Sequence, residues 1–286
     1  MINQTHQGRS AAHGSETMPV SLLYIPAHQA ELYDKAIASD AQAIIIDLED
    51  AVPAVAKELA RETLLNELAP RLGKKNYVRL NHDPQLLVDD LQVIAGLDID
   101  GVIIPRAELE ITRQVMQELP TDLERILLIE TARGLNELDS LAEFATSFAI
   151  GRVDLMADLR MNESRIELLF PILLDIVVKS AAHGLAAPIA PAHLNVRDRD
   201  RDSIHKFSQD FFDLGFRSQT AIHPYFCELI HEVFLPSVEE YQSAQNYLAE
   251  FAESAGLCVD AGGNFVDPAV LRKYQEVVSR FEYPSR

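Results

Sequence analysis

The chain has 286 residues, of which 48% are hydrophobic and 24% are charged, so it is long enough to bury the core of one large domain. Its 44 acidic residues outnumber its 25 lysines and arginines, and the formal net charge of −19 argues against binding to a nucleic-acid backbone. Two cysteines, Cys227 and Cys258, are too few for a disulfide framework, and no segment has the apolar length of a membrane span or the pattern of a signal peptide. These features predict a cytoplasmic protein that binds neither nucleic acid nor membrane.

Eight short apolar runs follow a polar N-terminal segment. Residues 1–18 are rich in Gln, Ser, His and Gly, which predicts a mobile arm outside the fold. The apolar runs have the length of buried parallel strands, and most of them end in charged or polar residues. They are residues 21–25, 43–47, 76–80, 101–104, 126–129, 147–150, 187–190 and 220–222.

Amphipathic stretches typical of helices separate these runs. They are residues 29–38, 54–68, 85–95, 111–119, 135–144, 163–183 and 203–214. Eight strands that alternate with helices predict an α/β fold, a closed (β/α)8 TIM barrel over residues 19–224. An open doubly wound sheet is the alternative, but Pro26, Ala27 and His28 follow the first strand where that fold has a glycine-rich turn.

The remaining residues, 225–286, exceed what closure of a barrel requires. Their pattern is mostly helical, with a short loop at residues 260–264 and a last helix at residues 268–281. Asp267 and Pro268 form a favourable helix start, an N-cap followed by proline at the first helical position. We therefore expect a C-terminal helical extension that packs on a neighbouring subunit.

Two carboxylates end neighbouring predicted strands. Glu130 follows the fifth strand and Asp154 follows the sixth, and adjacent parallel strands lie about 4.8 Å apart. Both side chains could therefore reach one cation above the rim of the barrel, and Mg²⁺ accepts a few carboxylates together with waters and substrate oxygens. The alternative is that each acid only caps the helix that follows it. The register of the pair favours the metal.

Three further acids, Asp47, Glu49 and Asp50, close the second predicted strand. At a period of two residues, Asp47 and Glu49 face the same side and Asp50 faces the other. Acids this close repel one another and need a cation, a basic partner or bound water to remain ionised. They either support the metal site or belong to a solvated loop before the next helix.

Arg79 ends the third predicted strand, where its guanidinium could clamp a substrate carboxylate or stabilise an enolate oxygen. An ion pair with Asp47 or Glu49 is a competing and compatible interpretation. Other candidate substrate contacts at the strand ends are Asp50, Pro105, Arg106, Gly151 and His223. Of these, Arg106 could simply lie on the surface, and His223 could be a hydrogen-bonded structural residue. No Ser-His-Asp or Cys-His grouping and no strand-end lysine points to covalent catalysis.

Several strand-end motifs resemble the citrate lyase beta-subunit branch of the HpcH/HpaI aldolase superfamily. The resemblance runs in order from about residue 19 to residue 280. The motifs are SLLYIP at residues 21–26, IDLEDAV at 46–52, VRLN at 78–81, IPR at 104–106, LIET at 128–131, AIHP at 221–224, FLPS at 234–237 and FVDP at 265–268.

The resemblance implies a Mg²⁺-dependent barrel, assembled as a homotrimer or hexamer, that makes or breaks a carbon–carbon bond between an acyl-CoA enolate and a 2-oxo acid. Its substrates would be 3-hydroxy acyl-CoA esters such as citryl-, citramalyl- or malyl-CoA, cleaved to acetyl-CoA and a 2-oxo acid by a retro-Claisen route. In that reaction the metal acidifies the substrate hydroxyl, an arginine meets the enolate oxygen, and an acid/base group moves the proton.

Residue by residue, the resemblance implies Glu130 and Asp154 as the metal ligands and Arg79 as the enolate-stabilising arginine. It implies Asp267 as an acid/base group that acts across a subunit boundary, which gives the C-terminal extension a purpose. The acidic loop of the family falls on Asp47, Glu49 and Asp50, of which Asp47 and Glu49 are the catalytic candidates.

The chain departs from the pattern of the family at four positions. Val20 stands where the family usually has arginine, Gln219 and Arg106 where it has lysine, and Val153 where it has an acid before Asp154. The loss of two cations, at Val20 and Gln219, from a region that meets CoA in relatives favours an alternative, a CoA-independent aldolase or lyase for a small 2-oxo acid such as pyruvate or oxaloacetate. A third interpretation is a non-catalytic barrel that serves as a binding or scaffold subunit.

Overall fold

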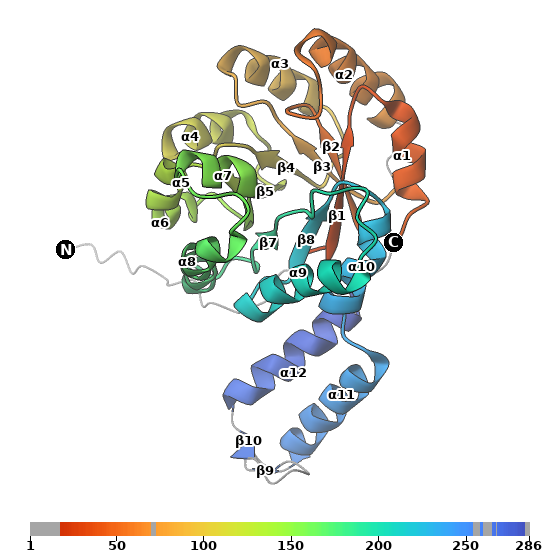
Figure 1. The fold of residues 1–286 in the computed structure, drawn as a ribbon, viewed down its shortest axis with the longest axis vertical. Coiled ribbons are helices and arrows are strands. Elements are labelled where there is room, and N and C mark those ends of the chain that lie inside the picture. The colour runs from red at the N-terminus through yellow and green to blue at the C-terminus, as the bar shows by residue number, and fades with distance from the viewer. Residues whose placement is uncertain (1–17, 70–72, 254–257, 260–264, 267, 284–286) are drawn as a thin grey trace, which may run out of the picture.

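Eight parallel strands form a closed barrel in the computed structural model, which describes residues 18–69, 73–253, 258–259, 265–266 and 268–283 (Figure 1). Each strand pairs with the next, and the last strand closes the ring on the first. The strands are β1 (Ser21–Pro26), β2 (Ala43–Asp47), β3 (Lys75–Arg79), β4 (Gly101–Ile104), β5 (Glu124–Ile129), β6 (Ser147–Ile150), β7 (Ile189–Ala190) and β8 (Ser218–Ala221). The barrel prediction is confirmed, and an open doubly wound sheet is excluded.

Alternation along the strands divides the core into two layers. In β2, Ile44 and Ile46 pack with the apolar faces of the helices, whereas Ala43 and Ile45 join a smaller cluster inside the barrel. Met18 also belongs to the inner cluster and is 6% exposed, so the predicted arm of residues 1–18 is one residue too long. The rest of that arm, residues 1–17, lies outside the described residues.

The inward-facing rows of the barrel end in charged side chains. Asp47 follows the buried Ile45 by two residues, and Arg79 follows the buried Tyr77 by two. Because side chains in a strand alternate between its faces, both charged groups point to the interior at the carboxyl end of the barrel. The row of β5 continues in the same way to Glu130, which is 4% exposed.

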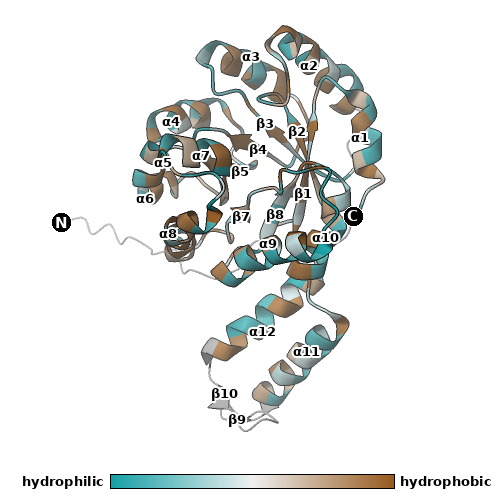
Figure 2. Cartoon of the chain, viewed as in Figure 1, coloured by the Kyte–Doolittle hydropathy of each residue, from teal (hydrophilic) through white to brown (hydrophobic). Residues whose placement is uncertain are grey.

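Helices surround the barrel and connect its strands (Figure 1). They are α1 (Ala30–Ile37), α2 (Lys57–Thr63), α3 (Pro84–Ile94), α4 (Leu109–Glu118), α5 (Ala132–Asn136), α6 (Leu138–Leu141), α7 (Arg152–Asp158), α8 (Phe170–Ala182), α9 (Arg201–Leu214) and α10 (Tyr225–Phe234). Figure 2 shows brown and teal residues alternating along them, as expected for helices that bury one face. Capping fixes several ends: the Asp83 carboxylate accepts from the backbone N–H groups of Gln85 and Leu86 at the start of α3, and α9 ends at Gly215 with φ 111°.

Three connections differ from the sequence prediction. The helix predicted over residues 54–68 is divided into a 3-10 turn (Ala54–Ala56), α2 and a π-helical turn (Leu64–Leu68). The stretch 163–183 becomes helical only at Ile166, because Asn162 Oδ1 accepts from the Ser164 N–H and hydroxyl and holds a turn there. The stretch 135–144 divides into α5 and α6, and the seven-residue α7, which follows β6 directly, was not predicted.

The C-terminal extension is an antiparallel pair of helices, α11 (Val238–Glu253) and α12 (Pro268–Phe281), that projects away from the barrel (Figure 1). A two-stranded ribbon of β9 (Cys258–Val259) and β10 (Phe265–Val266) lies at its far end. The helices are joined by stacked rings, with centroids 4.2 Å apart for Tyr241 and Phe281 and 4.6 Å apart for Tyr247 and Tyr274.

The end of α12 is attached to the barrel of its own chain. Arg217, directly before β8, pairs with Glu276 of α12. Arg280 is buried, with its guanidinium 5.1 Å from the centre of the Phe212 ring of α9. One end of the extension is therefore fixed to the barrel of its own chain. The packing of the extension on a neighbouring subunit stays a prediction.

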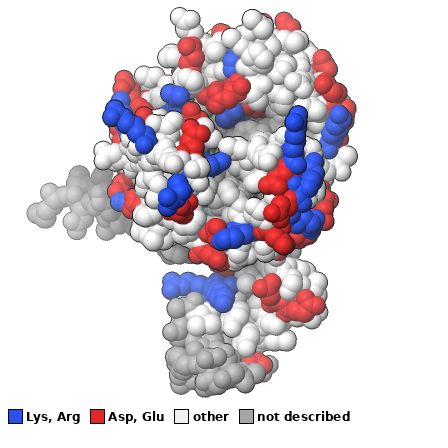
Figure 3. All heavy atoms as spheres, viewed as in Figure 1, with Lys and Arg blue, Asp and Glu red and all other residues white. Residues whose placement is uncertain are grey.

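Acidic and basic side chains are interspersed on the face of the barrel seen in Figure 3. The excess of acids over bases in the chain as a whole is large, with 44 against 25. Among the described helices, none has both the length and the apolar composition that crossing a bilayer requires.

Candidate active site

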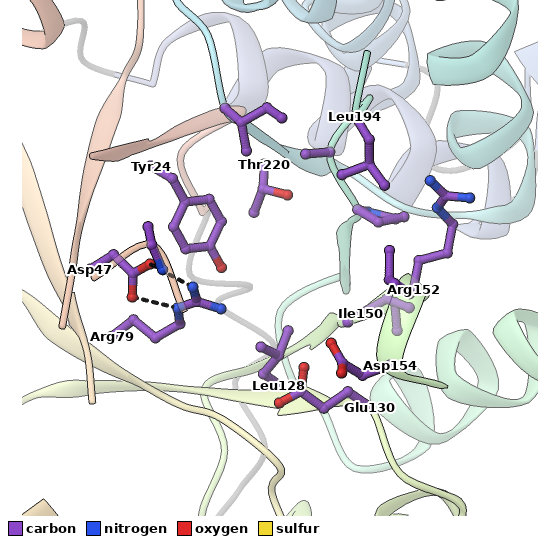
Figure 4. A pocket seen from close by; sticks show the side chains of 16 residues that line it. Tyr24, Asp47, Arg79, Leu128, Glu130, Ile150, Arg152, Asp154, Leu194 and Thr220 are labelled. Atoms are coloured by element: carbon purple, nitrogen blue, oxygen red, sulfur yellow. Dashed lines mark hydrogen bonds and ion pairs between the residues drawn. The ribbon is translucent and has the colours of Figure 1, made fainter. Parts of the chain in front are cut away.

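An open pocket lies at the carboxyl end of the barrel (Figure 4). Its lining comes from six of the eight strands and from the segments that follow them, as expected for the functional face of this fold. The lining residues are Tyr24, Asp47, Ala51, Arg79, Leu128, Glu130, Ile150, Gly151, Arg152, Val153, Asp154, Pro191, Ala192, Leu194, Thr220 and Ile222.

Asp47 and Arg79 form a two-point ion pair on one side of the pocket. The register of β2 and β3 sets them opposite each other, with Arg79 Nε 2.7 Å from Asp47 Oδ1 and Arg79 Nη2 2.6 Å from Asp47 Oδ2. The fully buried Asp47 carboxylate also accepts from the backbone N–H groups of Glu49 and Ala51. The ion pair foreseen for Arg79 is present, and it fixes the orientation of the guanidinium.

The two other acids of this loop also approach Arg79. Arg79 Nη1 lies 3.2 Å from Glu49 Oε2 and 3.6 Å from Asp50 Oδ2. The prediction that Asp50 faces away from Glu49 is wrong, because β2 ends at Asp47 and the chain then turns, so the alternation of a strand no longer applies. Lys57 supports the turn by donating from Nζ to the backbone carbonyls of Leu48 and Glu49.

Glu49 is buried and has an unusual affinity for protons. Burial raises its pKa to about 8, and the charges of Asp50 and Asp47 add to the increase while Arg79 opposes it. His82 Nδ1 lies 2.7 Å from Glu49 Oε1, whereas Oε2 has no hydrogen bond among the described residues. The alternative of a solvated loop is therefore wrong for Asp47 and Glu49, which are both buried.

Tyr24 of β1 covers Arg79 and was not identified from the sequence. The centre of its ring lies 4.9 Å from the guanidinium carbon of Arg79. Figure 4 shows its hydroxyl pointing into the pocket. Burial raises the pKa of this phenol far above its usual value, so the hydroxyl keeps its proton and can donate a hydrogen bond. Its position in the inward row of β1 was the available signal.

Glu130 and Asp154 lie side by side at the other side of the pocket, and both carboxylates face it (Figure 4). Glu130 Oε1 accepts from the backbone N–H of Arg106 at 2.7 Å, and Asp154 Oδ1 lies 3.8 Å from Arg106 Nη2. Burial raises the pKa of Glu130 to about 7, and the charges of Glu49 and Asp154 add to this increase. The predicted meeting of the two carboxylates is thus found in the structure.

Gly151 is the residue that makes room for Glu130. A Cβ at this position would overlap Glu130 Oε2 and lie 2.5 Å from Glu130 Cβ. The backbone of Gly151 has φ −85°, which any residue adopts, so only space requires glycine here. Its predicted contact with a substrate stays a prediction.

The pair of carboxylates suits a metal ion whose other coordination positions are filled by water and substrate oxygens. Among the described residues there is no cluster of three or more His, Cys, Asp and Glu side chains with metal-binding geometry. Zinc sites usually have three or four such ligands, whereas Mg²⁺ is often held by one or two carboxylates with waters and substrate oxygens. Two acids beside an open pocket therefore suit Mg²⁺ better than a closed structural metal.

Besides Glu49 and Asp50, which contact Arg79 but do not line the pocket, four other predicted residues lie away from the lining or beyond the described chain. Pro105 is buried, and Arg106 has φ 44° with an exposed side chain. His223 Nδ1 accepts from the backbone N–H of Tyr225 at 3.1 Å, the structural alternative foreseen for it. Asp267 lies outside the described residues.

Val20 and Gln219 do not reach the pocket. They are 2% and 1% exposed, and the Gln219 N–H donates to the Val20 carbonyl at 2.8 Å. The Gln219 side chain donates to the carbonyl of Pro191. Both side chains are buried within the fold, and the CoA-independent alternative drawn from these two positions stays a prediction.

Arg152 was also missed, although it directly follows Gly151 at the end of β6. Its half-buried side chain lines the pocket near the apolar residue Leu194 (Figure 4). Among the described residues its Nε has no hydrogen-bond partner, and burial lowers its pKa while the charge of Glu163 opposes this. Its place beside Gly151 at the end of β6 was the available signal.

Comparisons with known proteins agree with this geometry. The sequence model of the HpcH/HpaI aldolase/citrate lyase family matches residues 20–224. A (3S)-malyl-CoA thioesterase of Cereibacter sphaeroides is 32% identical over 243 residues, which cover 82% of this chain and 83% of the relative. The crystal structure of CitE from Mycobacterium tuberculosis in complex with magnesium, acetoacetate and coenzyme A has a TM-score of 0.73 and 26% identity and covers 93% of this chain and 98% of its own.

A second structure from Mycobacterium tuberculosis, the citrate lyase beta subunit complexed with oxaloacetate and magnesium, has a TM-score of 0.67 and 26% identity. The match covers 78% of this chain and 99% of that structure. With the barrel, the pocket at its carboxyl end and the family match over 20–224, the resemblance seen in the strand-end motifs is confirmed. The chain belongs to the HpcH/HpaI aldolase/citrate lyase family.

Proposed function

We propose that this protein is a Mg²⁺-dependent carbon–carbon lyase that cleaves a 3-hydroxy acyl-CoA ester, such as citryl-, citramalyl- or malyl-CoA, to acetyl-CoA and a 2-oxo acid. The observation that carries the proposal is the pairing of Glu130 with Asp154 in the same pocket as Arg79. Relatives bound to magnesium with oxaloacetate, or with acetoacetate and coenzyme A, support it.

Glu130 and Asp154 are the residues that would hold the metal. Their two carboxylates balance the charge of a divalent ion, and a cation bound between them would offset the burial that raises the pKa of Glu130 to about 7. Bound Mg²⁺ supplies a Lewis acid that polarises the oxygens of the substrate.

Arg79 would stabilise the negative charge that develops on the enolate oxygen of the departing acetyl group. Its guanidinium has five N–H bonds, and Asp47 takes two of them, one from Nε and one from Nη2. The remaining N–H groups of Nη1 and Nη2 are left for the acids of the loop and for a ligand. The two-point pair with Asp47 fixes their direction before substrate binds, which is how an enzyme favours a transition state over a ground state.

Glu49 is the described group best suited to hold or move a proton near neutral pH, because burial raises its pKa to about 8. Asp267, which the family resemblance implies as acid/base group, stays part of the proposal. In a homo-oligomer, trimer or hexamer, it would reach the pocket of a neighbouring subunit, and the projection of α11 and α12 away from the barrel agrees with such an assembly (Figure 1).

A second candidate is hydrolysis of the same thioester, which the 32% identity to a (3S)-malyl-CoA thioesterase favours. The two activities differ in products. Cleavage of the carbon–carbon bond gives acetyl-CoA and a 2-oxo acid, whereas hydrolysis gives free CoA and the intact hydroxy acid.

The experiment is incubation of the pure protein with citryl-, citramalyl- and malyl-CoA in the presence of Mg²⁺, followed by chromatography of all products. Acetyl-CoA with a 2-oxo acid supports the lyase, and free CoA with a hydroxy acid supports the thioesterase. Solvent exchange of the methyl protons of pyruvate without CoA supports the CoA-independent aldolase. A folded protein that gives none of these and binds no Mg²⁺ supports the non-catalytic subunit and refutes the proposal.

A further inference from the structure

Arg152 lines the pocket and forms no ion pair with any described residue. Its Nε is buried without a hydrogen-bond acceptor among those residues. The pocket's other lining arginine, Arg79, lies within 4 Å of three carboxylates. Partial burial of an unpaired guanidinium is unfavourable, so a site that keeps one is suited to an anionic ligand.

The charge of Glu163 acts on Arg152, but no ion pair joins the two side chains among the described residues. Leu194 also lines the pocket, and Figure 4 shows the Arg152 side chain extending toward it. Asp154 is only two residues away, but its ion pair is with Arg106 Nη2, at 3.8 Å. Arg152 therefore remains available, and a planar guanidinium is matched to a carboxylate in geometry.

We propose that Arg152 binds a second carboxylate of the substrate, distant from the metal, and so selects hydroxy or oxo acids with two carboxylates over those with one. This inference rests on the proposed function, because Glu130 and Asp154 must first fix the 2-hydroxy or 2-oxo acid head through Mg²⁺. Arg152 then contacts the far end of the acid. A preferred substrate releases a dicarboxylic 2-oxo acid of the oxaloacetate type rather than pyruvate or glyoxylate.

A binding measurement tests this without catalysis. Malate and lactate share the 2-hydroxy acid head and differ in the distal carboxylate, and neither is consumed in the absence of CoA. Calorimetry in Mg²⁺ should give a wild-type affinity for malate about tenfold or more above that for lactate, as a charge-assisted hydrogen bond provides. Arg152→Gln should abolish this preference by weakening malate alone, and Arg152→Lys should keep part of it.

Arg160→Gln is the matched control, because Arg160 is exposed at the end of α7 and does not line the pocket. It should leave both affinities unchanged. An unchanged ratio of malate to lactate affinity in Arg152→Gln overturns the inference. If Arg152→Gln loses affinity for CoA but not for malate, the inference is also overturned, since Arg152 would then bind a phosphate of CoA. A wild-type protein that binds neither acid with Mg²⁺ refutes the proposed function instead.

Discussion

Replacement of Gly151 by alanine is the sharpest test of how the carboxylate pair is held. The new Cβ would overlap Glu130 Oε2 and lie 2.5 Å from Glu130 Cβ, closer than real Cβ atoms approach another heavy atom. Because Gly151 has φ −85°, the backbone accepts alanine and the entire effect is steric. The Glu130 side chain must move, and it loses its 2.7 Å hydrogen bond from the Arg106 N–H.

The magnitude follows from these contacts. Overpacking of a buried site destabilises a protein by about 1–3 kcal/mol, which lowers the Tm by several degrees for a chain of this size. Displacement of a carboxylate from its supported position should weaken Mg²⁺ binding by about 10- to 100-fold. Scanning calorimetry measures the first effect and titration calorimetry the second.

Gly96→Ala is the control, because a Cβ at Gly96 would meet no atom within 4 Å and the position is exposed. It should leave both the Tm and the Mg²⁺ affinity unchanged. If Gly151→Ala binds Mg²⁺ as tightly as the wild type, then Glu130 does not need this position, and the assignment of Glu130 as a metal ligand is refuted.

Three further predictions concern the same pocket. Glu130→Gln and Asp154→Asn should each abolish thioester cleavage and weaken Mg²⁺ binding by at least about tenfold, since each removes one of two anionic ligands; retained Mg²⁺ affinity in titration calorimetry would contradict the metal assignment. Because the pKa of Glu130 is raised to about 7, its carboxyl is neutral below that pH, so Mg²⁺ must displace a proton. Affinity should therefore fall by about tenfold for each pH unit below 7, and equal affinities at about pH 6 and pH 8 would exclude this competition. Asp47→Asn breaks a buried ion pair with Arg79 and should lower the free energy of unfolding by about 3 kcal/mol or more in denaturant titration; a change near zero would show that Glu49 can replace Asp47.

The sequence predicted the barrel because a strand buried on both faces has a short, almost continuous apolar run. The predicted bounds of β2, β4 and β6 agree with the structure, since every residue of these strands is buried and most are apolar. β7 contains only Ile189 and Ala190 and has no such run, so its predicted start at residue 187 was too early. The apolar pattern of the sequence therefore predicted strand bounds correctly in β2, β4 and β6, where a mostly apolar run is buried.

The sequence did not predict side-chain positions that depend on a turn after a strand or on the arrangement of strands around the closed barrel. Asp50 approaches Arg79 only because the chain turns after β2, and no strand pattern contains that turn. Tyr24 looked like one more apolar strand residue until closure of the ring set it over Arg79. Val20 and Gln219 were judged by their place in a motif, whereas burial removes them from the pocket.

Glu130 and Asp154 were predictable because both follow strands that are neighbours in sequence and in space. In a barrel with consecutive strand order, adjacency along the chain is also adjacency around the ring. Arg152 follows the same strand as Asp154, but the significance of its side chain depends on the absence of a partner. Only the structure shows that no described residue forms an ion pair with Arg152, because possible partners are distributed over the whole chain.

The attachment of α12 has a mechanical consequence for the projecting helices. α11 has 16 residues, which corresponds to a length of about 24 Å at 1.5 Å per residue. Over that length, a tilt of about five degrees where α12 meets the barrel displaces the far end of the helices by about 2 Å. The joint near Arg217 and Arg280 must therefore resist bending if the tip is to meet another molecule reproducibly. Arg217 also borders β8, which contains Thr220 of the pocket lining. The contacts that hold the projecting helices therefore lie next to a strand that lines the pocket.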